Sequence, residues 1–191
     1  MKKVSFEEVL KQMLDEHHPF PSQSMQYLSN LTDAKLHQVQ KIWPSLSEKR
    51  RISLLEEMEI ISDSDSVPNF DRIAFIALKD SLPAIRALGI RLLWQTADPK
   101  LVSIFSKMLK EDPDLEVRAQ ATSALGTYIY LGEIEELPEE IFKPLESLLL
   151  QTLQTSPHTI LRRRALEALG FSSRPEIPVL IREASKQNTS D

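Results

Sequence analysis

The chain contains no cysteine, only four glycines and no long apolar run among its 191 residues. The absence of cysteine excludes disulfide bonds, thiolate metal sites and a cysteine nucleophile. So few glycines argue against a glycine-rich phosphate loop and, beside 12 prolines, against many tight hairpins. Because no run approaches the ~20 apolar residues of a membrane span, we expect no membrane association. Two N-terminal lysines are followed by acids instead of an apolar signal core, so we expect a cytoplasmic protein.

Basic residues are also in deficit. The sequence has 23 lysines and arginines against 28 acidic residues, which gives a net charge of −5. Nucleic-acid-binding domains usually carry a basic surface, so this charge disfavours a nucleic-acid partner. The hydrophobic share of 41% is ordinary for a globular protein, and the abundant Leu, Ala, Glu, Lys and Gln are good helix formers. We therefore predict an all-α protein.

Catalytic and metal-binding constellations are missing as well. His37 and His158 stand isolated, and no Gly-x-Ser-x-Gly, His-Glu-x-x-His or phosphate-loop motif occurs. His17 and His18 are adjacent, but neighbours on a helix point about 100° apart and no carboxylate cluster supports them. The alternating acids within 62–69 lack an EF-hand's glycine and glutamate, and we predict a polar linker there. We predict no enzyme activity, no cofactor, no metal ligand and no catalytic residue.

Apolar residues recur at helical spacing along the chain, and N-cap residues precede several of these stripes. Ser5 begins a capping-box pattern, Thr32 or Asp33 is a cap candidate for the next helix, and Ser45 or Ser47 for the one after. The predicted helices span 5–16, 32–42, 45 or 47 to 61, 70–80, 83–96, 98 to about 109, 112–126, 138–154, 157–170 and 176–186.

The stretch 112–126 shows a unit that repeats, with an acidic cap, an arginine, small residues at helical spacing and a closing glycine. When the second helices of the predicted helical hairpins are aligned, Arg86, Arg118 and Arg162 occupy the same position, and we call them the column arginines. A weaker copy aligns at Arg51. Small residues three and six positions later let neighbouring helices approach closely. We predict that each arginine pairs with a capping residue of its own or the adjacent repeat, an architectural role. The capping residues six positions earlier are Asp80, Asp112 and Ser156.

Residues 69–186 resemble HEAT-type α-solenoid repeats, particularly the short variety also seen in phycobilisome-lyase-like proteins. The residues that carry the resemblance are Asp112, Val117-Arg118-Ala119, Ala121 and Ala124-Leu125-Gly126, and again Leu161-Arg162, Ala165 and Ala168-Leu169-Gly170. Trp94 replaces the glycine in the Arg86 copy. The resemblance implies an all-α, right-handed α-α superhelix of the ARM/HEAT type, with about four helical hairpins plus terminal helices. It implies little about chemistry, because HEAT families mostly bind partners as scaffolds.

The expected organisation is an N-terminal helix and linker over 1–30, a HEAT-like array over 31–186 and a polar tail over 187–191. Within the array we expect hairpins over 31–62, 69–96, 98–131 and 138–170, and a partial repeat over 175–186. An acidic insert over 131–140 lengthens one repeat. It either carries binding, as insertions in repeat proteins often do, or prolongs a helix and adds a longer turn.

These features predict a non-catalytic scaffold that binds a protein partner through the concave groove lined by second helices. The candidate partner-binding residues follow the column arginines by four or five positions, or belong to the non-recurring arginines. They are Ile90, Arg91, Thr122, Ser123, Arg163, Arg164, Leu166 and Glu167. Two alternatives stay open: nucleic-acid binding through Arg162–Arg164 and Lys49–Arg51, and an N-terminal structural segment of a larger solenoid.

Overall fold

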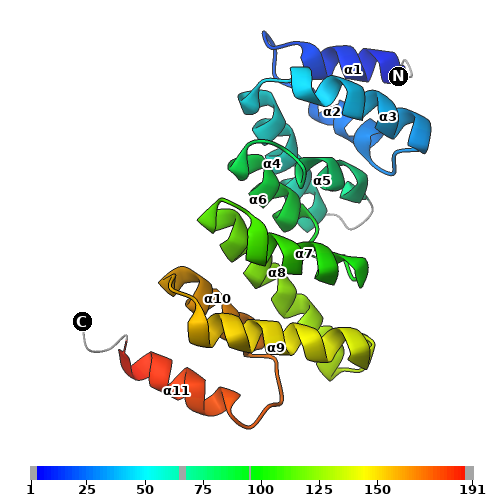
Figure 1. Ribbon diagram of the computed structural model, residues 1–191. Coiled ribbons are helices and arrows are strands. Elements are labelled where there is room, and N and C mark those ends of the chain that lie inside the picture. Colours follow the sequence, from blue (N-terminus) through cyan, green and yellow to red (C-terminus); the bar gives the residue numbers. More distant parts are fainter. Residues whose placement is uncertain (1–3, 65–67, 95, 188–191) are drawn as a thin grey trace. The chain divides into compact units, whose positions relative to one another are not determined.

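The computed structural model describes residues 4–64, 68–94 and 96–187, with side chains to residue 184. These residues form eleven α-helices and two short 3₁₀ helices, and no β-strand occurs among them (Figure 1). The predicted all-α class is therefore confirmed. The chain divides into two compact units, Met1–Leu93 and Trp94–Asp191, and each unit has its own packed helices.

The first unit begins its main helices at the caps that the sequence indicates. The Ser5 hydroxyl accepts a hydrogen bond from the backbone N–H of Glu8, and the Thr32 hydroxyl accepts one from Lys35. The Ser47 hydroxyl accepts from the N–H of Arg50 at the start of the next long helix. The elements are α1 (Phe6–Leu14), α2 (Ser22–Met25), η1 (Gln26–Leu28), α3 (Asp33–Ile42), η2 (Trp43–Ser45), α4 (Glu48–Ser64), α5 (Asp71–Ala77) and α6 (Pro83–Leu92).

The core of the first unit lies where α6 packs against both α4 and α5, while α3 contacts α1 and α5. Leu54, Leu55 and Met58 of α4 are buried, and so are Ile85 and Ile90 of α6. Pro83 occupies the first turn of α6, where its missing N–H breaks no intrahelical bond. The apolar stripes predicted for these helices are therefore the residues that hold the unit together.

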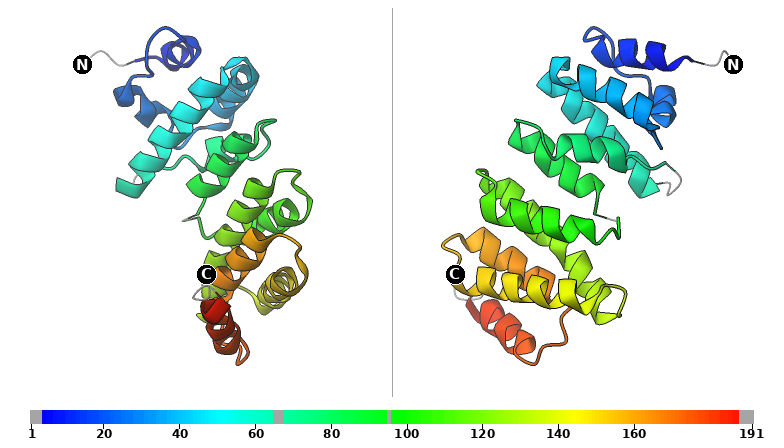
Figure 2. Two further views of the ribbon diagram at one scale, coloured as in Figure 1. Left: turned by 90° about the vertical axis from the view of Figure 1, so that its left-hand side faces the viewer. Right: turned by 45° about the vertical axis from the view of Figure 1, so that its right-hand side comes forward.

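The second unit is built around its longest helix. α8 packs against α7, α9 and α10, and α10 lies beside both α8 and α9 (Figures 1 and 2). A Cβ added at Gly126 of α8 would stand 3.1 Å from the Cα of Ala168 on α10, so the two backbones are in close contact. The elements are α7 (Lys100–Glu111), α8 (Leu115–Glu133), α9 (Glu139–Thr155), α10 (Thr159–Leu169) and α11 (Ile177–Gln187).

Two predicted details of α8 are wrong. Its N-cap is Asp114, whose carboxylate accepts hydrogen bonds from the N–H groups of Glu116 and Val117. Asp112 instead bonds the N–H of Asp114 and closes the turn that precedes the helix. The helix also runs through Gly126 to Glu133. Gly126 does not end it, because this glycine serves the close packing against α10.

The predicted polar linker is shorter than expected. α4 continues to Ser64, where the Ser64 hydroxyl donates to the carbonyl oxygen of Ile61. Residues 65–67 of the predicted linker lie outside the described residues. The acidic insert prolongs α8 to Glu133 and adds a turn before α9.

The column arginines bind mostly main-chain oxygens. Arg118 donates from Nε to the carbonyl of Leu109 in the last turn of α7, and Arg162 donates from Nη1 to the carbonyl of Ser156 at the C-cap of α9. Arg86 donates to the carbonyls of Asp80 and Ser81 just after α5. Each guanidinium thus places a cation at the negative end of the preceding helix. Arg51 reaches the Asp80 carboxylate, as the pairing prediction expects.

The turn after α8 offers a direct stability test. The N–H of Glu135 bonds the carbonyl of Gly132, and that of Glu136 bonds Leu131, which is a Schellman motif. Glu135 has φ 62°, a left-handed conformation that disfavours a side chain. Glu135→Gly should therefore stabilise the protein by about 0.5–1 kcal/mol, once the greater entropy of glycine in the unfolded chain is deducted from the relieved strain. Urea unfolding measures this change in the free energy of unfolding. Glu136→Gly is the control, and it should destabilise the protein because Glu136 lies outside the left-handed region. Equal changes in the two variants would contradict the expectation.

Candidate partner-binding groove

The second helices α8 and α10 enclose a groove of about 460 Å³ on the surface of the second unit. Its floor is made of small residues because Gly126 and Ala168 bring the two helix backbones together. Polar side chains flank this floor, and two aromatic rings stand at one end. The lining residues are Ser123, Gly126, Thr127, Tyr130, Arg164, Glu167, Ala168 and Phe171.

The aromatic end of the groove is a pair of exposed rings. Tyr130 and Phe171 have 48% and 57% of their surface exposed. Their ring centroids are 5.9 Å apart at an interplanar angle of 69°, an edge-to-face contact. Tyr130 reaches this position because α8 continues past Gly126, and Phe171 follows directly after α10. Two large apolar rings held in water next to a groove are typical of a binding surface.

The loop that carries Phe171 is tied to a buried carboxylate. Glu146 of α9 is only 4% exposed and accepts hydrogen bonds from the Ser172 hydroxyl and from Nε of Arg174, both at 2.5 Å. The hydrogen bond to Glu146 raises the pKa of Arg174 more than burial lowers it. The N–H of Ser173 also donates to a carboxylate oxygen of Glu133 at the end of α8. Phe171 therefore stands on a fixed loop.

The rim of the groove that α10 forms is charged. Glu167 accepts hydrogen bonds from Arg163 at 2.8 Å and from Arg164 at 2.9 Å, all on one face of α10. Burial raises the pKa of Glu167, but the two arginine hydrogen bonds and charges outweigh it and lower the pKa below its usual value. Two cations share one carboxylate here, which leaves this rim with a net positive charge.

The structure brings together only some of the predicted partner-binding residues. Ser123, Arg164 and Glu167 line the groove; Arg163 is exposed one residue from it, and Leu166 is half-buried.

The other three predicted residues lie elsewhere. Ile90 and Thr122 are buried, and the Thr122 hydroxyl donates to the carbonyl of Arg118 within α8. Arg91 belongs to the first unit, where it makes two hydrogen bonds to Glu59. Their side chains are therefore engaged within the fold.

Sequence reasoning did not select the aromatic pair. Phe171 lies between the predicted helices 157–170 and 176–186, Tyr130 lies within the predicted hairpin 98–131, and 41 positions separate them in the sequence. No local signal marks them, because Ile129 and Leu131 flank Tyr130 and Leu169 precedes Phe171 by two positions, so both rings have aliphatic neighbours in the sequence.

Comparisons with protein-family models, with curated proteins and with solved structures found no match. Among the described residues, no three His, Asp or Glu side chains gather into a group that could hold a metal ion. Within the same residues, no helix has the length and apolar character needed to cross a bilayer.

Proposed function

We propose that this chain is a non-catalytic scaffold of the HEAT-repeat type, with the right-handed superhelix of that class, that binds a protein partner. A recurring contact supports the repeat assignment. In the three pairs α5/α6, α7/α8 and α9/α10, the second helix carries an arginine that bonds carbonyl oxygens at the end of the first helix. The same bond in three successive pairs is what a tandem array requires. A cytoplasmic location stays a prediction.

The observation that carries the binding proposal is the exposed aromatic pair at the α8–α10 groove. Tyr130 and Phe171 offer apolar surface, and the floor at Gly126 and Ala168 leaves room beneath them. Aromatic side chains are enriched among the residues that dominate binding energy in protein interfaces. A partner side chain of apolar character can therefore pack against the exposed surfaces of the two rings.

The contacts of the arginine clusters favour a protein partner over nucleic acid. Arg162 is bound to a main-chain carbonyl, and Arg163 and Arg164 share Glu167. Arg50 donates to main-chain carbonyls of the first unit, and Arg51 pairs with buried Asp80. Phosphate binding needs cations that are free to face a backbone, and these guanidinium groups are already engaged.

The test is a double substitution, Tyr130→Ala with Phe171→Ala, in the full chain. Peptides selected on the wild-type protein from a displayed random library serve as probes, and fluorescence anisotropy gives their Kd. We expect the double variant to bind at least about tenfold more weakly, with the thermal midpoint little changed because both rings are exposed. Ile60→Ala, which removes an even more exposed apolar side chain of α4, should leave the Kd unchanged. Selected peptides that bind the double variant as tightly as the wild type would overturn the proposed site.

A further inference from the structure

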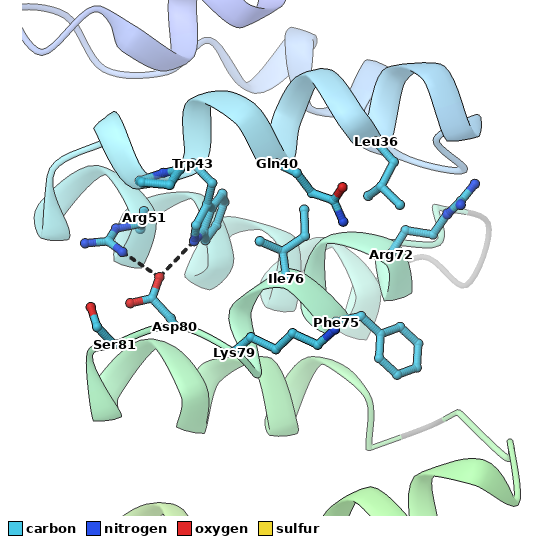
Figure 3. A pocket seen from close by; sticks show the side chains of 11 residues that line it. Leu36, Gln40, Trp43, Arg51, Arg72, Phe75, Ile76, Lys79, Asp80 and Ser81 are labelled. Carbon is cyan, nitrogen blue, oxygen red and sulfur yellow. Dashed lines mark hydrogen bonds and ion pairs between the residues drawn. The ribbon is translucent and has the colours of Figure 1, made fainter.

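A second groove lies in the first unit between α3 and α5 and has a volume of about 590 Å³ (Figure 3). Leu36 and Gln40 of α3 face Arg72 and Ile76 of α5 across it, and Phe75 of α5 also belongs to its lining. The other lining residues, Trp43, Pro44, Arg51, Lys79, Asp80 and Ser81, come from η2, α4 and the segment after α5.

The middle of this groove is apolar and only partly covered. Leu36, Phe75 and Ile76 are half-buried, so part of each side chain faces the open groove. Gln40 extends from α3 toward Ile76 (Figure 3). Its amide can both donate to and accept from the backbone of a bound segment. The apolar strip favours burial of aliphatic or aromatic side chains, and Gln40 adds a polar contact at its centre.

The charge that this groove presents to solvent is positive, although the whole chain has a net charge of −5. Its one carboxylate, Asp80, has a side chain only 1% exposed and is hydrogen-bonded to Trp43 and Arg51. Lys79 is exposed and makes no ion pair within the described residues. Arg72 is partly exposed, and its carboxylate partner Asp33 has a side chain 93% exposed, so water already competes for that pair.

We propose that this α3–α5 groove binds an acidic amphipathic peptide segment of a partner protein. Apolar side chains of the segment pack on Leu36, Phe75 and Ile76, and its carboxylates pair with Lys79 and Arg72. The partner's acidity follows from charge complementarity, because a basic segment would meet these cations with no accessible carboxylate in the groove lining. The apolar floor distinguishes such a segment from a nucleic acid, whose phosphates would gain nothing from it. This site belongs to the first unit and is independent of the α8–α10 groove.

The test uses three short synthetic peptides of equal length, titrated into the full chain and followed by fluorescence anisotropy. One has Leu and Phe at helical i, i+3, i+4 spacing with Glu elsewhere, the second has Lys in place of Glu, and the third is a scramble of the acidic one. We expect the acidic amphipathic peptide to bind most tightly and to weaken as salt rises. Lys79→Glu should weaken it at least about tenfold.

Matched variants separate this site from the others. Lys107→Glu, which reverses an exposed lysine of α7, and the Tyr130→Ala/Phe171→Ala variant should both bind the acidic peptide as the wild type does. Phe75→Ser should weaken binding, with thermal unfolding checking that the fold is kept. Equal binding of the scrambled peptide, unchanged affinity in Lys79→Glu, tighter binding of an RNA oligonucleotide, or loss of binding only in the Tyr130→Ala/Phe171→Ala variant would each overturn the proposal.

Discussion

Replacing Asp80 with alanine is expected to lower the free energy of unfolding by about 3–5 kcal/mol. The carboxylate of Asp80 accepts hydrogen bonds from the indole Nε1 of Trp43 at 2.8 Å, from Nη1 of Arg51 at 2.5 Å and from the N–H of Leu82 at 2.9 Å. These bonds join η2, α4 and the α5–α6 turn. Alanine would leave a largely buried guanidinium and a buried indole N–H without an acceptor. Domains are commonly stable by only about 5–15 kcal/mol, so this loss is large.

A matched control isolates the buried pairings from the turn itself. The Asp98 carboxylate accepts from the N–H of Lys100 at 2.9 Å, the same geometry that joins Asp80 to Leu82. It makes no other hydrogen bond within the described residues. Asp98→Ala should therefore cost about 1 kcal/mol, the usual loss of a capping side chain. Urea unfolding of both variants makes the comparison, and losses of equal size would show that the Trp43 and Arg51 bonds add nothing.

The pH dependence of unfolding gives a second measurement on the same carboxylate. Burial raises the pKa of Asp80, but the hydrogen bonds from Leu82, Trp43 and Arg51, with the charge of Arg51, outweigh it and lower the pKa. The unfolded chain therefore takes up this proton at a higher pH than the folded one. The stabilisation that ionised Asp80 gives the folded state is complete above the ordinary aspartate pKa. It is lost as the pH falls through the lowered pKa of Asp80 in the folded state. Asp80→Asn should remove this part of the acid-side loss of stability.

Local rules predict the helices well because caps and apolar stripes act within a few residues. Ser5, Thr32 and Ser47 cap the helices that their positions indicate. Gly126 shows where local rules fail. A glycine after an apolar stripe is most often a helix end, yet α8 continues because this glycine contacts Ala168 on another helix. Gly126 and Ala168 are 42 positions apart in the sequence, so a pattern within one helix cannot predict their contact.

The candidate site shows the same limit. Position relative to the column arginine predicts which side of a helix a residue occupies, but it does not predict how many neighbours cover that side. α8 is packed by α7, α9 and α10, so Thr122 is buried while Ser123, the next residue, lines the groove. The partnership of Trp43 with Asp80 likewise joins residues 37 positions apart. Each residue is ordinary in its own sequence context, and only the tertiary packing makes the pair.

Glu146→Ala is expected to cost about 3 kcal/mol and to weaken binding at the α8–α10 groove as well. Glu146 is a buried carboxylate whose two hydrogen bonds hold Ser172 and Arg174 against α9. Removing one partner of such a pair leaves the other desolvated and unmatched. The same loop carries Phe171, so its release should also increase hydrogen exchange at the amides of Ser172 and Ser173, which bond Leu169 and Glu133 in the wild type.

Glu139→Ala is the control on the same helix. Glu139 also has a cationic partner, Lys143, but both side chains are largely exposed, and such a surface pair contributes little to stability. A loss of several kcal/mol for Glu146→Ala, beside almost none for Glu139→Ala, would assign the effect to the buried position. If Glu146→Ala lowers stability but leaves peptide affinity and loop exchange unchanged, the loop keeps Phe171 in place without Glu146. The aromatic end of the groove would then be positioned by the Ser173–Glu133 hydrogen bond and the ring contact with Tyr130.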